Sequence, residues 1–244
     1  MAKTFAELGL SRDLLKVLEE LGIKEPTEIQ EKAIPLAIQG KDVIGGSATG
    51  SGKTLVFGSA ILVNLRARRV VQAIILTPTG ELAEQVSESL KKFSKYISLR
   101  VTAVYGGVSI EPQIRNLAVA DVVVGTPGRM LDHLQRGTIR FDEVKILVLD
   151  EVDRMFDMGF RDDVERIVSR CPKHRQTLFF SATLTSDIDR FSKKYTKNPI
   201  EVAVQSYVDP SKLHQVYYDI PSSLKFPLFV HLLKHEKSKL VMVF

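Results

Sequence analysis

The residues best suited to chemistry are SATGSGKT at 47–54 and DEVD at 150–153, and each segment follows a short apolar run. In the first segment, small residues let backbone N–H groups approach phosphate oxygens, and Lys53 would neutralise the β- and γ-phosphates. The Thr54 hydroxyl would bind Mg²⁺. The segment predicts a phosphate-binding loop, although Ser47 stands where the standard pattern has its first glycine. The predicted contacts come from Ser47, Ala48, Thr49, Gly50, Ser51, Gly52, Lys53 and Thr54.

The acidic segment supplies the second half of a magnesium-nucleotide site. Asp150 ends the apolar run ILVL, where a carboxylate can hold Mg²⁺ through its water shell. Glu151 can orient or deprotonate the attacking water. Taken alone, the loop could be a flexible strand-to-helix turn and the acids a solvated strand end. Their presence together favours the nucleotide site, with Lys53, Asp150 and Glu151 as candidate catalytic residues.

The elements that must position these residues follow from an alternation of apolar runs and helical periods. We expect strands at residues 43–44, 73–76, 101–105, 122–124, 146–149, 178–180 and 201–204. We expect helices at residues 55–65, 82–93 and 164–168. This pattern predicts an α/β fold, with a parallel sheet covered by helices on both faces. Ligands of such sheets bind at the carboxyl ends of the strands, so the motif segments that follow the strands should share one edge.

Together these segments resemble the DEAD-box family of ATP-dependent RNA helicases. The resemblance covers residues 5–204, one RecA-like P-loop domain, and continues weakly beyond it. GIKEPTEIQ at residues 22–30 resembles the family's glutamine motif, which implies that Gln30 hydrogen-bonds the adenine edge while Phe5 stacks on the ring. An amide can satisfy the donor and acceptor of adenine but not those of guanine. Without the resemblance, Gln30 would be read as a surface helix residue. The nucleotide-binding residues implied here are Phe5, Lys24, Thr27 and Gln30.

Three further segments resemble the family's RNA-binding motifs. Thr126 could cap a helix that has Pro127 at its first position, leaving N–H groups aimed at a phosphate. Arg129 would add a positive charge. Such contacts grip the RNA backbone and carry no sequence information. The alternative is a pair of well-made helix starts. The implied RNA-binding residues are Pro78, Thr79, Gly80, Gly106, Gly107, Thr126, Pro127, Gly128 and Arg129.

SAT at residues 181–183 resembles the motif whose hydroxyls meet the last acid of DEVD. The resemblance implies that Ser181 and Thr183 link Asp153 to strand separation. Two residues depart from the family pattern. Val152 replaces an alanine, with its extra methyls expected to face the core. Gly80 replaces the usual arginine, which should weaken RNA-backbone binding and lower its salt dependence by about one charge.

The 244 residues suggest more than one domain. We expect a RecA-like domain at 1–204, a linker at 205–212 and the start of a second RecA-like domain at 213–244, with strands at 215–220 and 240–244 around a helix at 224–234. No arginine-finger segment of the family's second domain occurs here. Unwinding should therefore need that further domain, and this chain should hydrolyse ATP slowly. The alternatives are a non-catalytic nucleotide- or RNA-binding fragment and, less well supported, a DNA helicase or another P-loop ATPase.

Bulk properties agree with a soluble, cytoplasmic, monomeric protein that has no membrane contact. The net charge of +5 is compatible with a polyanionic partner. Cys171 is the single cysteine, which excludes an internal disulfide and favours a reducing compartment. No apolar run approaches the ~18 residues that span a bilayer. Residues 1–15 predict an amphipathic entry helix rather than a signal peptide. His133 and His174 have no identifiable partners and should be structural or exposed.

Overall fold

The computed structural model describes residues 3–46, 50–204, 214, 216–236 and 240–243. The chain divides into two units, Met1–Ser206 and Tyr207–Phe244, and each is described by itself. The predicted residues Ser47, Ala48 and Thr49 lie outside the described part.

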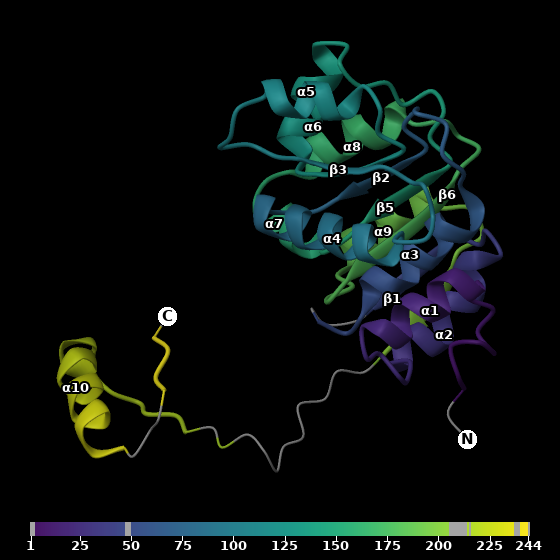
Figure 1. The fold of residues 1–244 in the computed structure, drawn as a ribbon. Helices are drawn as coiled ribbons and strands as arrows, with labels where there is room; N and C mark the ends of the chain where they lie inside the picture. Colours follow the sequence, from purple (N-terminus) through teal and green to yellow (C-terminus); the bar gives the residue numbers. More distant parts are fainter. Residues whose placement is uncertain (1–2, 47–49, 205–213, 215, 237–239, 244) are drawn as a thin grey trace. The chain divides into compact units, whose positions relative to one another are not determined.

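In the described part of the first unit, seven strands form one parallel sheet in the order β3-β4-β2-β5-β6-β1-β7 (Figure 1). Each strand expected in this unit is present. Continuous apolar runs suit them because both faces of a parallel sheet are buried. The strands are β1 (Val43–Gly46), β2 (Ala73–Leu76), β3 (Val101–Val104), β4 (Val122–Gly125), β5 (Ile146–Leu149), β6 (Gln176–Ser181) and β7 (Ile200–Ala203).

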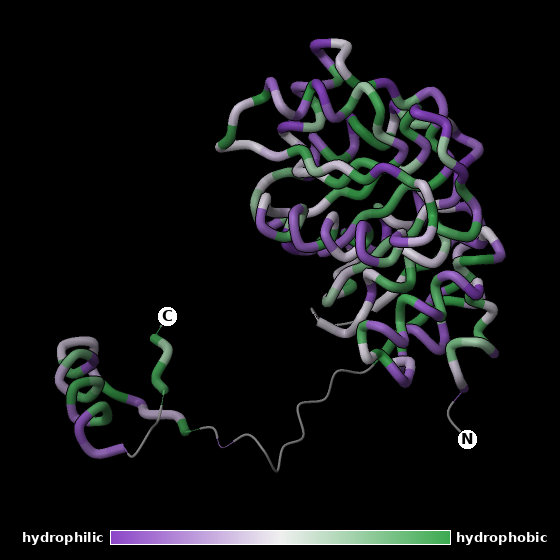
Figure 2. Tube along the Cα trace, viewed as in Figure 1, coloured by the Kyte–Doolittle hydropathy of each residue, from purple (hydrophilic) through white to green (hydrophobic). Residues whose placement is uncertain are grey.

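Alternate residues of the central strands β4, β2, β5 and β6 pack into two separate cores. In β2, Ala73 and Ile75 join one apolar cluster, whereas Ile74 and Leu76 join the other. The first cluster is covered by α1 (Arg12–Glu20), α2 (Glu28–Ile38), α3 (Lys53–Asn64) and α4 (Gly80–Phe93). The second is covered by α5 (Glu111–Leu117), α6 (Pro127–Gln135), α7 (Val152–Asp157), α8 (Arg161–Arg170) and α9 (Ser186–Tyr195). The sheet is therefore covered on both faces, as expected, and Figure 2 shows hydrophobic residues along its strands.

The helix starts explain why the predicted periods become helices where they do. Thr79 and Thr185 precede α4 and α9, and each side chain accepts a hydrogen bond from a backbone N–H in the first turn. The expectation of an entry helix over residues 1–15 is wrong. Residues 5–9 form turns, and α1 begins only after Ser11, whose side chain accepts from the Leu14 N–H. Gly9 has a φ of +89°, which ends the turn before the helix.

The second unit contains the expected helix as α10 (Lys225–His235), preceded by a short 3₁₀ turn at Ser222–Leu224. The two expected strands are not formed: residues 216–220 and 240–243 have no regular structure. A strand needs a hydrogen-bonded neighbour, and the described residues of this unit provide none. Its assignment to a second RecA-like domain stays a prediction. Among all described residues, no helix is both long and apolar enough to span a bilayer.

Candidate functional site

The order of the strands sorts the motif segments into two adjacent groups. β5, β6 and β1 are neighbours in the sheet, and they lead into DEVD, SAT and the phosphate loop. β3, β4 and β2 are neighbours in the other half, and they lead into Gly106–Gly107 and the segments that begin α6 and α4. All strands run in the same direction, so the segments share one edge. The candidate nucleotide and RNA segments therefore meet where β2 pairs with β5.

Two glycines give the described part of the phosphate loop its shape. Gly50 and Gly52 have φ values of +80° and +93°, in the left-handed region that glycine tolerates best. Gly52 directly precedes α3, so the first N–H groups of that helix face the loop. A Cβ at Gly52 would lie 2.2 Å from Nε2 of Gln30. Both the backbone conformation and the neighbouring side chain therefore require glycine at this position.

Lys53 and Asp150 form a buried ion pair between the first residue of α3 and the end of β5. Lys53 Nζ lies 3.5 Å from Asp150 Oδ1, and their side chains are 6% and 5% exposed. Burial raises the pKa of Asp150, while the Lys53 ammonium acts in the opposite direction. The two halves that the sequence separates by a long stretch are thus in contact, beside the loop that would hold phosphates.

Glu151 lies next to this pair in a strained backbone conformation. Its φ of +52° is in the left-handed region, where a non-glycine residue is uncommon and often marks a functional site. The side chain is buried, and its Oε2 lies 3.3 Å from Arg154 Nη1, one turn along α7. The turn between β5 and α7 therefore holds Glu151 at the sheet edge next to Asp150.

Gln30 is buried at the first turn of α2, with both ends of its amide engaged. Oε1 accepts from the Thr27 N–H at 2.9 Å, and Nε2 donates to the Gly52 carbonyl oxygen at 3.0 Å. The Thr27 hydroxyl donates to the Ser51 carbonyl oxygen at 2.7 Å. The start of α2 therefore holds the backbone of the phosphate loop. Sequence reasoning connected Gln30 with adenine only and missed this link.

Phe5 is buried, and it lines a cavity of about 340 Å³ within the first unit. Lys24 is exposed and lines the same cavity, so two residues of the predicted nucleotide-binding set come together there. The remaining lining residues are Thr4, Ala6, Leu15, Leu18, Glu19 and Ile23. An apolar cavity with a cation at its margin has the character of a small-molecule site.

On the other half of the edge, Pro78 and Thr79 lead into α4, and Gly80 is its first residue. Tyr105, at the end of β3, covers Gly80 so closely that a Cβ there would lie 2.6 Å from Tyr105 Cδ2. The Tyr105 hydroxyl is hydrogen-bonded to Glu84 one turn further along α4. Tyr105 was not among the predicted residues. The sequence offered one indication of its role, which is that Tyr105 directly precedes the predicted RNA-binding residue Gly106.

Arg129 fastens the exposed Gly106–Gly107 loop to α6. Its Nη1 and Nη2 both donate to the Val108 carbonyl oxygen at 3.2 Å, and Nε lies 3.9 Å from Asp132 Oδ2. Thr126 does occupy the cap position with Pro127 next, as expected, but its side chain makes no cap hydrogen bond within the described structure. Gly128 is exposed at the same helix start. Of the predicted residues, Pro78 and Pro127 are buried, whereas Gly106, Gly107 and Gly128 are exposed, and Arg129 has a structural contact.

Asp153 joins the two catalytic-side segments. Its Oδ2 accepts from the Ala182 N–H at 3.1 Å, the Thr183 N–H at 2.9 Å and the Thr183 hydroxyl at 3.0 Å. Partial burial raises the pKa of this carboxyl, but its hydrogen bonds, first those from Thr183 and then that from the Arg154 N–H, act in the opposite direction and the pKa is lowered. Ser181 Oγ donates to the Thr183 carbonyl oxygen at 2.7 Å. Contact between DEVD and SAT is therefore present, with Thr183 as its main donor.

Two side expectations have definite outcomes. Val152 is fully buried in the second core, so its extra methyls do face the interior. His133 was expected to be structural or exposed, and it is structural: it is buried, and its ring nitrogens lie 2.8 Å from Thr138 Oγ1 and 3.2 Å from Gln113 Oε1, partners that the sequence did not identify. Burial lowers the pKa of His133, which favours the neutral ring in this structural role.

Comparison with known proteins gives a consistent result. The family model described as DEAD/DEAH box helicase matches residues 27–191. The chain is 44% identical over 245 residues to a DEAD-box ATP-dependent RNA helicase CshA of Geobacillus kaustophilus, covering 99% of this chain and 52% of that protein. It is 42% identical over 243 residues to CshA of Streptococcus pneumoniae, covering 98% and 46%. The chain thus spans about half the length of the curated relatives it matches.

Solved structures agree with the sequence matches. A DEAD box protein from the hyperthermophile Methanococcus jannaschii superposes with a TM-score of 0.81 at 37% identity, covering 97% of this chain and 65% of the other. A hypothetical ATP-dependent RNA helicase from Sulfolobus tokodaii gives 0.75 at 36%, covering 80% and 57%. At these identities the likeness supports both fold and ancestry, and the first unit has the RecA-like fold that the sequence predicted.

Proposed function

Because this chain belongs to the DEAD/DEAH box helicase family, we propose that it is the ATP-binding part of an ATP-dependent RNA helicase. One observation carries the proposal most directly. Asp153 is hydrogen-bonded to Thr183, so DEVD and SAT are joined beside the phosphate loop. The candidate RNA segments lie on the neighbouring strands of the same sheet edge. ATP on one half of this edge and RNA on the other would therefore contact loops that follow neighbouring strands.

ATP would bind with its phosphates on the loop that precedes α3 and its adenine beside the start of α2. The Gln30 amide, which uses one N–H on Gly52 and one lone pair on Thr27, still has an N–H and a lone pair for the adenine edge. Phe5 and Lys24 would contribute from the neighbouring cavity. Lys53 would neutralise charge on the β- and γ-phosphates, joined by the N–H groups at the start of α3.

The donor set at this site fits Mg²⁺. The ion keeps several waters and takes one or two protein oxygens together with substrate phosphates, which matches Asp150 and the hydroxyl of Thr54. Burial raises the pKa of Asp150 and so disfavours the ionised carboxylate. A nearby divalent cation would oppose this effect and favour the ionised form. When bound, Mg²⁺ would draw charge from the β- and γ-phosphate oxygens.

Hydrolysis would be in-line attack of water on the γ-phosphate. Glu151 would accept a hydrogen bond from this water, fix its orientation and take its proton. Lys53 would stabilise the charge that develops on the phosphate oxygens. The left-handed backbone at Glu151 sets the direction in which its side chain leaves the chain. The ion pair with Arg154 would hold the carboxylate in place until the water binds.

RNA would be held by its backbone along the surface formed by Thr79, Gly80, Gly106, Gly128 and Arg129, without sequence readout. Release of the second strand would require a second RecA-like domain, which we place in the longer proteins of this family. We also propose a cytoplasmic, monomeric protein. The single cysteine, Cys171, supports a reducing compartment.

The test compares single-turnover hydrolysis of Mg²⁺-ATP by the unchanged chain and by Glu151→Gln. Asp157→Asn, an exposed acid on the same helix, is the matched control. We expect slow but measurable phosphate release that Glu151→Gln lowers at least ~100-fold, the range of general-base catalysis. Affinity for ATP should be unchanged in both variants. Equal phosphate release by the unchanged chain and Glu151→Gln would overturn the proposal and support a non-catalytic binding module.

A further inference from the structure

A second cavity of the first unit lies at the opposite edge of the sheet, where the strands begin. Arg175 and Asp42 directly precede β6 and β1, and both line it. Its volume of about 390 Å³ is in the range of small-molecule sites. Because Ser181 ends β6, the length of this strand separates the cavity from the nucleotide site by roughly 15–20 Å. The function proposed above makes no use of this cavity.

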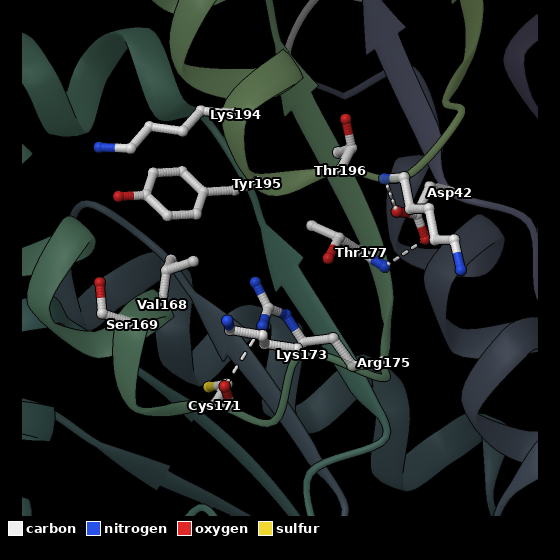
Figure 3. A pocket seen from close by; sticks show the side chains of 11 residues that line it. Asp42, Val168, Ser169, Cys171, Lys173, Arg175, Thr177, Lys194, Tyr195 and Thr196 are labelled. Carbon is white, nitrogen blue, oxygen red and sulfur yellow. Dashed lines mark hydrogen bonds between the residues drawn. The ribbon is translucent and has the colours of Figure 1, made fainter.

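The Arg175 guanidinium lines this cavity and is held in place by its own loop. Its Nη1 donates to the carbonyl oxygens of Pro172 at 2.7 Å and Cys171 at 3.4 Å, which fixes the guanidinium. Its Nε is buried and has no hydrogen-bond partner among the described residues. The remaining guanidinium nitrogen, Nη2, carries N–H donors of the kind that bind oxygens of a phosphate or carboxylate. Figure 3 shows this guanidinium in the middle of the lining side chains.

The charges around Arg175 favour an anion. Lys173 and Lys197 are exposed on the two loops that frame the cavity, and neither forms an ion pair within the described structure. Lys194 also lines the cavity, but its ammonium is paired with Glu165. The lining therefore has three cations available, from Lys173, Arg175 and Lys197.

Asp42 is the opposing charge, and it is already engaged. Its Oδ1 accepts from the Thr177 N–H at 2.8 Å, and its Oδ2 accepts from the Lys197 N–H at 2.6 Å. Burial raises the pKa of Asp42, while these hydrogen bonds and the charges of Arg175 and Lys197 act in the opposite direction. Figure 3 shows Asp42 at one end of the pocket, away from Arg175 at its centre. The available cations therefore outnumber the carboxylate where a ligand would meet Arg175.

We propose that this cavity binds a small multivalent oxyanion of the phosphate class. The Arg175 guanidinium binds an oxygen of the phosphate through Nη2, and Lys173 and Lys197 supply charge from the rim. A compact ligand is favoured because the cavity has a volume of only about 390 Å³. The same chemistry is offered by free pyrophosphate and by the phosphate tail of a nucleotide.

The test is a pyrophosphate titration without Mg²⁺ at constant ionic strength, followed by ¹H–¹⁵N correlation spectroscopy. The Arg175 Nε–Hε resonance, assigned with Arg175→Lys, reports this cavity, and the Gly52 amide separately reports the phosphate loop. We expect the Arg175 resonance to shift and saturate. In Lys173→Gln/Lys197→Gln, which leaves Arg175 and its carbonyl contacts intact, affinity should fall about tenfold as two nearby charges are lost. Arg140→Gln, an exposed cation outside the cavity, should leave it unchanged.

Two outcomes overturn the proposal. If the Gly52 amide saturates while the Arg175 resonance stays in place, the phosphate loop is the phosphate site and the cavity is not. If the Arg175 resonance moves linearly and sodium chloride reproduces the shift, the lysines only attract counter-ions. A parallel titration with ADP identifies the source: tighter saturation than with pyrophosphate assigns a nucleotide tail, and equal or weaker saturation assigns the free anion. These readouts do not depend on hydrolysis, so failure here leaves the Glu151 test unaffected.

Discussion

The side-chain amide of Gln30 donates a hydrogen bond to the backbone carbonyl of Gly52 at 3.0 Å, across 22 residues of sequence. The same amide accepts from the Thr27 N–H, and the Thr27 hydroxyl reaches Ser51. The start of α2 and the phosphate loop are therefore one hydrogen-bonded unit. Binding of a base at Gln30 would therefore affect the backbone at Ser51 and Gly52, which would also contact the phosphates.

Replacing Gln30 tests this unit. In Gln30→Ala, both hydrogen bonds are lost, and at about 1 kcal/mol for each bond we expect ATP affinity to fall ten- to thirtyfold. Gln30→Glu keeps the acceptor for Thr27 but places a carboxylate against the Gly52 carbonyl, so it should bind at least as weakly. Isothermal titration calorimetry measures both, with Gln39→Ala, at the exposed end of α2, as control. Unchanged affinity in Gln30→Ala would disprove the coupling.

The hydrogen bonds at Asp153 predict a pH dependence. Its pKa is lowered in the folded state, so its contribution to stability is present above the unfolded value of about 3.9 and is lost as pH falls through the folded value. Asp153→Ala should therefore cost about 2 kcal/mol at pH 7, by loss of hydrogen bonds to a charged acceptor. The difference from the unchanged chain should shrink as pH is lowered below 4. Urea unfolding at several pH values measures it, and a pH-independent difference would contradict the charge-based explanation.

Gly80 and Tyr105 predict an interaction between two substitutions. Gly80→Arg adds a cation to the RNA surface, which should steepen the slope of log K against log salt by about 0.7 for single-stranded RNA. Its Cβ would collide with the Tyr105 ring, so the ring must move. We expect a larger gain in RNA affinity for Gly80→Arg in a Tyr105→Ala background than alone. Fluorescence anisotropy over a salt series measures both quantities, and additive effects would show that the ring moves freely.

Arg129 combines a charge with a structural contact, and two substitutions separate them. Arg129→Lys keeps the charge but loses the paired hydrogen bonds to the Val108 carbonyl. We expect Arg129→Lys and Arg129→Gln alike to speed hydrogen exchange of the Gly107 and Val108 amides. Only Arg129→Gln should also lower the salt slope of RNA binding. Exchange rates equal to those of the unchanged chain would show that the contact does not order the loop.

Cys171 should be chemically silent in the native protein. Burial raises the pKa of its thiol to about 12, and its sulfur donates to the Ile167 carbonyl oxygen. The thiolate that reacts with disulfide reagents is thus scarce at pH 8. We expect labelling to be at least ~100-fold slower than in urea and to follow the rate of opening. Rapid labelling without denaturant would contradict the buried position.

Most of the fold was predictable because local signals agree with burial. The apolar runs became strands, and capping residues such as Thr79 began helices where the period changed. The failures have physical causes. Residues 1–15 looked amphipathic, but Gly9 turns the chain before Ser11 caps α1. Residues 216–220 have strand-like composition, yet pairing decides strand formation and the described part of that unit offers no partner.

The sequence by itself determined which chemistry is possible: a lysine in a glycine-rich loop, an acidic strand end, and an amide upstream of both. Only the tertiary structure decided which of these residues meet. The sheet order β3-β4-β2-β5-β6-β1-β7 is not the chain order, and an apolar run does not specify its neighbour. Contacts such as Lys53 with Asp150 and Arg129 with Val108 arise from that order. So does the basic cavity around Arg175, where the starts of two strands distant in sequence bring their flanking loops together.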